Sequence, residues 1–191
     1  MLVHNATLFM AQERQSAEEA WPGDIIGIPN HGTLRIGDTL CGKEPLRYLG
    51  IPHFAPEHFR RVILKNPFKA KQMEKGLAQL TEEGAIQLFK PVTGREHILG
   101  AVGVLQFDVI IERLKSEYDV HIVAEPVNIA AVRWLSGDTA VLDRMRRENT
   151  SAMLVDSDGL PAMSFPTTWR LEKAMEEWPQ LAFLTARECV S

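Results

Sequence analysis

A cluster of basic side chains is the charge feature that stands out in this sequence. Six cations fall between residues 60 and 75, and Glu74 is the only acid among them. Cations gathered in this way contact the phosphate groups of nucleic acids, which supply affinity without reading the base sequence. A solvated basic face is the alternative interpretation. The candidate contact residues are Arg60, Arg61, Lys65, Lys69, Lys71 and Lys75.

Two further observations bear on the basic cluster. Phe68 lies within it, and we interpret this residue as part of the core rather than as a platform on which a base stacks. A second, shorter basic run consists of Arg144, Arg146 and Arg147. The formal net charge of the 191-residue chain is -4, so any contact with nucleic acid has to come from such local patches.

Other residue patterns that could do chemistry are weaker. Gly100 and Gly103 lie between a predicted strand and a predicted helix, where a phosphate turn could form, but no third glycine or ribose-binding carboxylate follows. We interpret them as tight strand-to-helix geometry with close packing. His53 and His58 lack metal-ligand spacing, and the turn DSDG at 156–159 lacks the distal glutamate of a calcium loop. The sequence therefore predicts no catalytic, cofactor-binding or metal-binding residue.

Composition indicates the compartment. Hydrophobic residues make up 45% of the chain, which allows a sizeable core. Cys41 and Cys189 form no CxxC pair, and we expect both to be free thiols in a reducing compartment. The N-terminus lacks the pattern of a signal peptide, and no apolar run reaches the ~18 residues of a membrane helix. We therefore expect a soluble, cytoplasmic protein without a membrane or DNA partner.

The basic cluster lies at the start of a regular run of predicted elements. A strand at 59–65 leads through Asn66, a predicted N-cap, into a helix that ends near Gly84. Two strands follow, and then a helix with one apolar stripe. The stripe consists of Phe107, Ile110, Ile111 and Leu114. A strand at 119–125 completes the order β-α-β-β-α-β, which is typical of ferredoxin-like folds.

The remaining residues suggest a repeat of this order and a separate β region. Residues 126–191 again predict β-α-β-β-α-β, with Asp138 as a helix cap and Pro166 at the start of the last helix. Patterns leave open whether the halves share one sheet. Residues 1–57 predict short strands at 3–10, 24–30, 32–37 and 38–42, too few to close a barrel. We predict an α+β chain with an incomplete β-barrel domain at 1–57 and a C-terminal α/β domain at 58–191, divided into 58–125 and 126–191.

Four segments carry a resemblance to a known family. They are WPGDIIGIPNHGTLRIGDTL, GIPHFAPEHFRRVILKNP, KGLAQLTEEGAIQLFKP and ILGAVGVLQFDVIIERLKSEYDV. Together they resemble the bacterial peptide chain release factor 3 family, which consists of translational GTPases related to elongation factor G. The resemblance is strongest between Trp21 and Pro126. The last segment is also similar to the third domain of elongation factor G, which supports the ferredoxin-like prediction.

The resemblance implies a role in translation termination. Proteins of this family use GTP on the ribosome to promote dissociation of class I release factors after peptide release. It implies ribosomal RNA and small-subunit proteins as partners, and class I release factors as indirect partners.

The family's GTP-binding domain has no counterpart in this sequence, because the P-loop and the N-K-x-D guanine motif are absent. We therefore expect a C-terminal fragment that is not an enzyme and binds no cofactor, with GTP or GDP bound by the missing domain. A free-standing ferredoxin-like module for ligand binding or dimerisation is the alternative hypothesis, which leaves the incomplete barrel unexplained.

Overall fold

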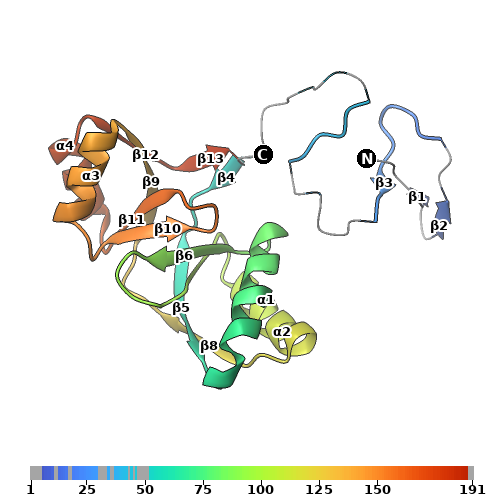
Figure 1. Ribbon diagram of the computed structural model, residues 1–191, viewed down its shortest axis with the longest axis horizontal. Coiled ribbons are helices and arrows are strands. Elements are labelled where there is room, and N and C mark those ends of the chain that lie inside the picture. Colours follow the sequence, from blue (N-terminus) through green and yellow to red (C-terminus); the bar gives the residue numbers. More distant parts are fainter. Residues whose placement is uncertain are drawn as a thin grey trace.

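The computed structural model describes residues 6–10, 13–16, 19–29, 34, 37–42, 44, 46 and 52–188. Four α-helices and an antiparallel eight-stranded sheet make the described part an α+β protein, as predicted. All four helices and this sheet lie after residue 57 (Figure 1). None of the helices in the described residues combines the length and the apolar character needed to cross a membrane.

The first unit, residues 58–126, has the predicted β-α-β-β-α-β order. Its strands pair in the antiparallel order β6-β7-β5-β8, which is the ferredoxin-like arrangement. Both helices pack on one face of these strands, where the apolar stripe of α2 buries Phe107, Ile110 and Leu114 and partly buries Ile111. The elements are β5 (His58–Leu64), the 3-10 turn η1 (Pro67–Lys69), α1 (Ala70–Glu82), β6 (Gln87–Pro91), β7 (Ile98–Ala101), α2 (Leu105–Tyr118) and β8 (Ile122–Pro126).

The second unit, residues 131–184, repeats this arrangement with the strand order β12-β9-β11-β10. Asp138 caps α3 as predicted, because its Oδ1 atom accepts hydrogen bonds from two backbone N–H groups of the first turn, at 2.9 and 3.3 Å. α4 begins two residues later than predicted, because the Thr167 hydroxyl oxygen caps it and Pro166 lies before the cap. The elements are β9 (Ala131–Gly137), α3 (Thr139–Glu148), β10 (Met153–Asp156), β11 (Pro161–Phe165), α4 (Thr168–Glu177) and β12 (Leu181–Leu184).

The two units share one continuous sheet. β6 and β10 pair antiparallel, with Phe89 opposite Asp156 and Pro91 opposite Leu154, and we call this junction the seam. The strand order across the seam is β12-β9-β11-β10-β6-β7-β5-β8. In Figure 1 the pair α3 and α4 lies at the left and the pair α1 and α2 at the lower right, with the strands between them.

A buried cluster on the sheet face away from the helices ties the units together. Phe89 packs there beside Trp134, with ring centroids 6.2 Å apart. The segment 55–57 covers one side of this cluster, since Ala55 packs against it. Backbone hydrogen bonds fix the segment at both ends. The Ala55 N–H group donates to the Thr185 carbonyl at 2.7 Å, and the Glu57 N–H group donates to the Ala101 carbonyl at 3.0 Å. The cluster consists of Phe59, Phe89, Ile98, Val132, Trp134, Leu154 and Ala162.

The N-terminal part differs in detail from the predicted strands. β1 (Thr7–Met10), β2 (Glu13–Ser16) and β3 (Ile26–Gly27) form a small sheet in the order β2-β1-β3. The polar sequence of β2 does not predict a strand. These residues are extended because they pair antiparallel with β1. The strand predicted at 38–42 is irregular, because no described strand lies beside it. The strand predicted at 32–37 falls mostly outside the described residues.

The last predicted strand is split in two. It forms β12 and then β13 (Ala186–Glu188), which leaves the main sheet and pairs with β4 (Pro52–Phe54). Cys41 carries a free thiol, as predicted, and Cys189 lies outside the described residues.

Candidate functional site

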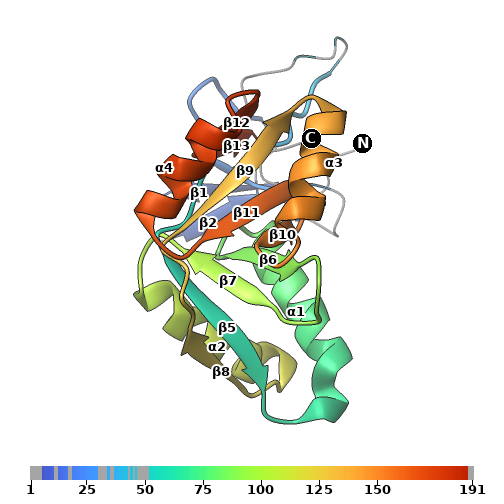
Figure 2. The same cartoon turned by 90° about the vertical axis from the view of Figure 1, so that its left-hand side faces the viewer.

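The predicted basic cluster runs along β5 and into the start of α1. In Figure 2 the connection from β5 to α1 forms the lower end of the molecule. Three of the cations have partners within the chain, and three do not among the residues that the structure describes. The first set is Arg60, Arg61 and Lys69, and the second is Lys65, Lys71 and Lys75.

Arg61 is held between two carboxylates. Its Nη1 atom lies 3.2 Å from the Glu96 carboxylate, and its Nη2 atom lies 3.4 Å from that of Glu125. The hydrogen bond that Arg61 donates to Glu96 is the main cause that raises the pKa of Arg61 above its ordinary value. Two negative partners offset one positive charge, so Arg61 adds no net positive charge to the surface.

Arg60 and Lys69 are also engaged. The Arg60 guanidinium lies 5.0 Å from the centroid of the Phe107 ring and donates to the Ala124 carbonyl at 3.3 Å. The Lys69 ammonium donates to the carbonyl of Asp119 at 2.6 Å and to its carboxylate. That hydrogen bond lowers the pKa of the Asp119 carboxyl. These two cations therefore contribute to the fold of the first unit.

Lys65, Lys71 and Lys75 have the properties of a contact surface. All three side chains are exposed, and the described part of the chain gives none of them an ion pair. Lys71 and Lys75 are four residues apart on α1, so they lie on the same side of the helix. These three lysines, which we call the free lysines, are available to phosphate groups.

Phe68 lies between the free lysines and is not a core residue. Its side chain is 97% exposed, so the interpretation as core is wrong. The apolar stripe of α1 is formed by Met73, Leu77 and Leu80, and Phe68 is five residues before Met73. That spacing is out of phase with the three- and four-residue steps of a helical stripe, so the sequence pattern itself places Phe68 off the buried face.

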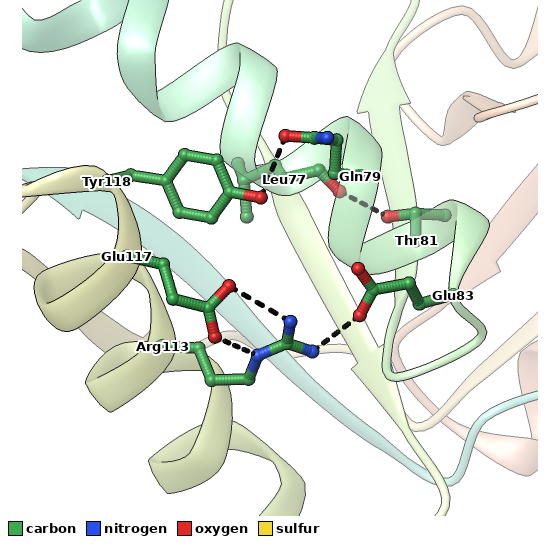
Figure 3. Close-up of polar contacts among 7 residues, drawn as sticks. All are labelled: Leu77, Gln79, Thr81, Glu83, Arg113, Glu117 and Tyr118. Atoms are coloured by element: carbon green, nitrogen blue, oxygen red, sulfur yellow. Dashed lines mark hydrogen bonds and ion pairs between the residues drawn. The ribbon is translucent and has the colours of Figure 1, made fainter. Parts of the chain in front are cut away.

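α1 is fixed in place by close contact with α2. A Cβ atom built on Gly76 would lie 2.7 Å from a methyl carbon of Leu114 and 3.0 Å from the Tyr118 ring, so only glycine allows this approach. Tyr118 also donates its hydroxyl hydrogen to the Gln79 side chain at 2.8 Å (Figure 3). The free lysines on α1 therefore have a rigid base.

Arg113 adds an ionic link between the same helices. It contacts Glu83 after α1 at 2.6 Å and Glu117 on its own helix at 2.6 Å (Figure 3). Hydrogen bonding from Arg113 to the Glu117 carboxylate is the main cause that raises the pKa of Arg113, and it also lowers the pKa of Glu117. Arg113 and Glu117 therefore stay charged near neutral pH.

The second basic run is largely neutralised. Arg144 contacts Glu148 at 2.8 Å, and Arg146 contacts Asp143 at 3.7 Å, both within α3. Arg147 is exposed and has no ion pair in the described ranges. One unpaired arginine offers less positive charge to a phosphate-bearing partner than the three free lysines do.

Gly100 and Gly103, interpreted as tight strand-to-helix geometry with close packing, lie at the end of β7 and before α2. A Cβ atom on Gly100 would lie 2.5 Å from Cγ of Pro56, whereas one on Gly103 would meet nothing within 4 Å. The close packing predicted for both glycines is therefore correct for Gly100 and wrong for Gly103. The Gln106 side-chain oxygen accepts hydrogen bonds from the N–H groups of Val102 and Gly103 at 2.9 and 3.0 Å. These donors are therefore occupied.

The remaining weak patterns are also structural where they are described. Asp156 accepts hydrogen bonds from the backbone N–H groups of Asp158 and Leu160 at 3.0 and 2.8 Å, as in a hairpin turn between β10 and β11. His58 is exposed, and the side chain of His53 lies outside the described residues. No group of three His, Cys, Asp or Glu side chains that could hold a metal ion occurs within the described ranges.

The sequence was compared with models of known protein families. The model of the C-terminal domain of class II release factor RF3 matches residues 48–175. The chain belongs to the class II release factor family. A second model, elongation factor G domain 2, matches residues 1–43.

The two matches agree with the order of the elements. The release-factor domain spans both ferredoxin-like units as far as α4, and the elongation factor G domain, which is barrel-like, spans β1 to β3. The resemblance and the predicted fold class are therefore confirmed. Both matched domains belong to translational GTPases, so the chain is part of a factor for protein biosynthesis and its termination. The domain boundaries at residues 57 and 125 stay predictions.

Proposed function

We propose that this chain docks on the ribosome and that its free lysines contact ribosomal RNA. The match of residues 48–175 to the C-terminal domain of a release factor is the observation that carries this proposal. Lys65, Lys71 and Lys75 support it, since exposed cations without intramolecular partners can neutralise phosphates. Ribosomal RNA and small-subunit proteins are the direct partners, and the cytoplasm is the compartment.

In the complete factor, docking serves the removal of class I release factors after peptide release. GTP or GDP is bound by a separate GTP-binding domain, and this chain is not itself an enzyme. Its part is to transmit the nucleotide state as a rigid body, for which the contacts between α1 and α2 and the shared sheet are suited. Class I release factors are therefore indirect partners.

The experiment is ribosome pelleting of the chain over a series of KCl concentrations. We expect the triple variant Lys65→Glu, Lys71→Glu, Lys75→Glu to lose most of its ribosome association. Each phosphate contact contributes roughly 0.7–0.9 to the slope of log affinity against log salt, so the slope should fall by roughly 2–3. The three side chains are exposed, so circular dichroism should show an unchanged fold.

The matched control makes the same change of charge elsewhere. Arg147, Arg170 and Lys173 are exposed and lie on α3 and α4 of the second unit. Reversal of these three charges should reduce pelleting much less. Equal losses in the two triple variants would mean that only total charge matters, and unchanged pelleting of the first would make the free lysines a solvated face.

A further inference from the structure

The exposure of Phe68 needs an explanation. At 97% exposure its ring has the highest value among the exposed large hydrophobic residues of the described part. Burying a phenylalanine side chain stabilises a fold by about 1.5–3 kcal/mol, and this contribution is absent here. A single exposed apolar residue is common on protein surfaces, so exposure alone decides nothing. The turn around Phe68 and the charges beside it carry the inference.

The backbone of this turn is rigid. Asn66 caps it as predicted, because its side-chain oxygen accepts a hydrogen bond from the Phe68 N–H group at 3.1 Å. The Lys69 N–H group donates to the Asn66 carbonyl at 3.0 Å, and Pro67 fixes its own φ angle. The ring is therefore presented by a backbone that loses little freedom when a partner binds.

The same turn is tied to the connection between α2 and β8. Lys69 contacts both the carbonyl and the carboxylate of Asp119, which adopts a left-handed φ of 54°. The Lys65 N–H group donates to the His121 carbonyl at 3.0 Å. These ties hold the turn outward, so that Phe68 cannot fold back onto the sheet without breaking them.

The charges around the ring favour a polyanion. The free lysines lie before and after Phe68 along the chain, and the positive charge of Lys69 is offset by Asp119. The three free lysines outnumber Glu74, the one acid between residues 60 and 75. An exposed aromatic ring among exposed cations is the combination with which proteins bind single-stranded nucleic acid.

We propose that Phe68 stacks on an unpaired RNA base while the free lysines bind the adjoining phosphates. This inference rests on the proposed ribosome docking, for which it names the contact. Phenylalanine has no hydrogen-bonding group, so the stack selects an unpaired base but not its identity. In a duplex, stacking between neighbouring base pairs covers the base faces, so duplex RNA is bound by the lysines alone.

The test measures binding of the 191-residue chain to fluorescein-labelled oligoadenylate and to a duplex RNA of equal length, by fluorescence anisotropy. We expect Phe68→Ala to weaken oligoadenylate binding roughly 5- to 100-fold, as for the loss of one stacked base. Duplex binding should change by less than about twofold, since phosphate contacts are kept. Phe68→Tyr should retain the affinity for oligoadenylate.

Phe68→Leu separates stacking from general apolar contact. Leucine keeps apolar area but lacks a flat ring, so this variant should bind oligoadenylate as weakly as Phe68→Ala does. Oligoadenylate binding at the wild-type level by Phe68→Ala or Phe68→Leu overturns the proposal. An equal loss of affinity for single-stranded and duplex RNA in Phe68→Ala overturns it as well. If Phe68→Ala weakens ribosome pelleting but not oligoadenylate binding, the ring contacts a ribosomal protein and stacking is refuted.

Failure of the stacking inference is distinguishable from failure of the docking proposal. The lysine triple variant tests docking on whole ribosomes, whereas the Phe68 variants are read on isolated RNA. Loss of pelleting in the triple variant together with unchanged oligoadenylate binding in Phe68→Ala refutes the stack alone. Selective loss of oligoadenylate binding in Phe68→Ala, with no ribosome association of the unaltered chain, supports the stack and refutes docking.

Discussion

Replacement of Gly100 by alanine tests how tightly the segment 55–57 is packed on the sheet. The added Cβ atom would lie 2.5 Å from Cγ of Pro56 and 3.0 Å from Cε2 of Phe89. Ordinary carbon contacts are about 3.5–4.0 Å, so the overlap with the proline ring is roughly 1 Å. The ring cannot move away easily, because backbone hydrogen bonds hold Ala55 and Glu57 on either side of it.

The expected magnitude follows from two opposing contributions. Overpacking of this kind destabilises a fold by about 1–3 kcal/mol. The loss of glycine flexibility in the unfolded chain stabilises by about 0.4–1 kcal/mol. From the middle of each range, the net effect of Gly100→Ala is a destabilisation of about 1.3 kcal/mol. In a chain of this size it lowers the thermal midpoint by roughly 3–5 °C, measured by calorimetry or circular dichroism.

Gly103→Ala is the matched control, because an added Cβ atom there meets nothing within 4 Å. Its midpoint should stay the same or rise slightly. A double-mutant cycle with Pro56→Ala isolates the contact with Cγ of Pro56. Its removal should reduce the cost of Gly100→Ala, while the two contacts at 3.0 Å, to Cε2 of Phe89 and to the Cβ atom of residue 56, remain. Equal midpoints for Gly100→Ala and Gly103→Ala would refute the close packing of Pro56 on Gly100.

Two further predictions concern protons and nucleotide. Burial, with a smaller contribution from Lys90, lowers the pKa of His97 below its ordinary value of 6.5, while Glu74 opposes the shift. The unfolded chain therefore binds a proton at His97 more readily than the folded chain does. The urea midpoint should fall as pH falls through 6.5 and level off below the pKa of His97 in the folded chain. The variant His97→Gln should show a flatter dependence of the urea midpoint on pH. Isothermal titration calorimetry of the chain with GTP and GDP should detect no binding, and micromolar affinity for either nucleotide would contradict the proposed division of labour.

Local signals account for the features that the sequence predicted correctly. Asn66 and Asp138 are helix caps because their side chains reach N–H groups two or three residues away. The buried stripe of α2 follows from helical spacing within one segment. Partners distant in the sequence account for what was missed. Arg61 contacts a glutamate 64 residues away, so no local pattern reveals that this cation is engaged.

The seam and the exposed phenylalanine were beyond prediction for related reasons. The residue pattern of β6 and β10 indicates which face of each strand is buried, but it does not indicate which strands pair at their edges. The pairing of Phe89 with Asp156 establishes that β6 and β10 are neighbours. Phe68 was assigned to the core because apolar residues are usually buried, whereas the cap at Asn66 and the anchor at Asp119 decide its direction. Both are properties of the assembled fold.

The seam also bears on the risk that the nascent chain aggregates during synthesis. β6 would be the open edge of the first unit until β10 has been made and can pair with it, and open edges recruit strands from other chains. At ~5–20 residues per second, that interval lasts several seconds. β6 ends in Lys90 and Pro91, a charge and a residue without an N–H donor, which are two common protections of open edges. A strand that is central in the finished protein thus carries the safeguards of an edge strand against aggregation of the nascent chain.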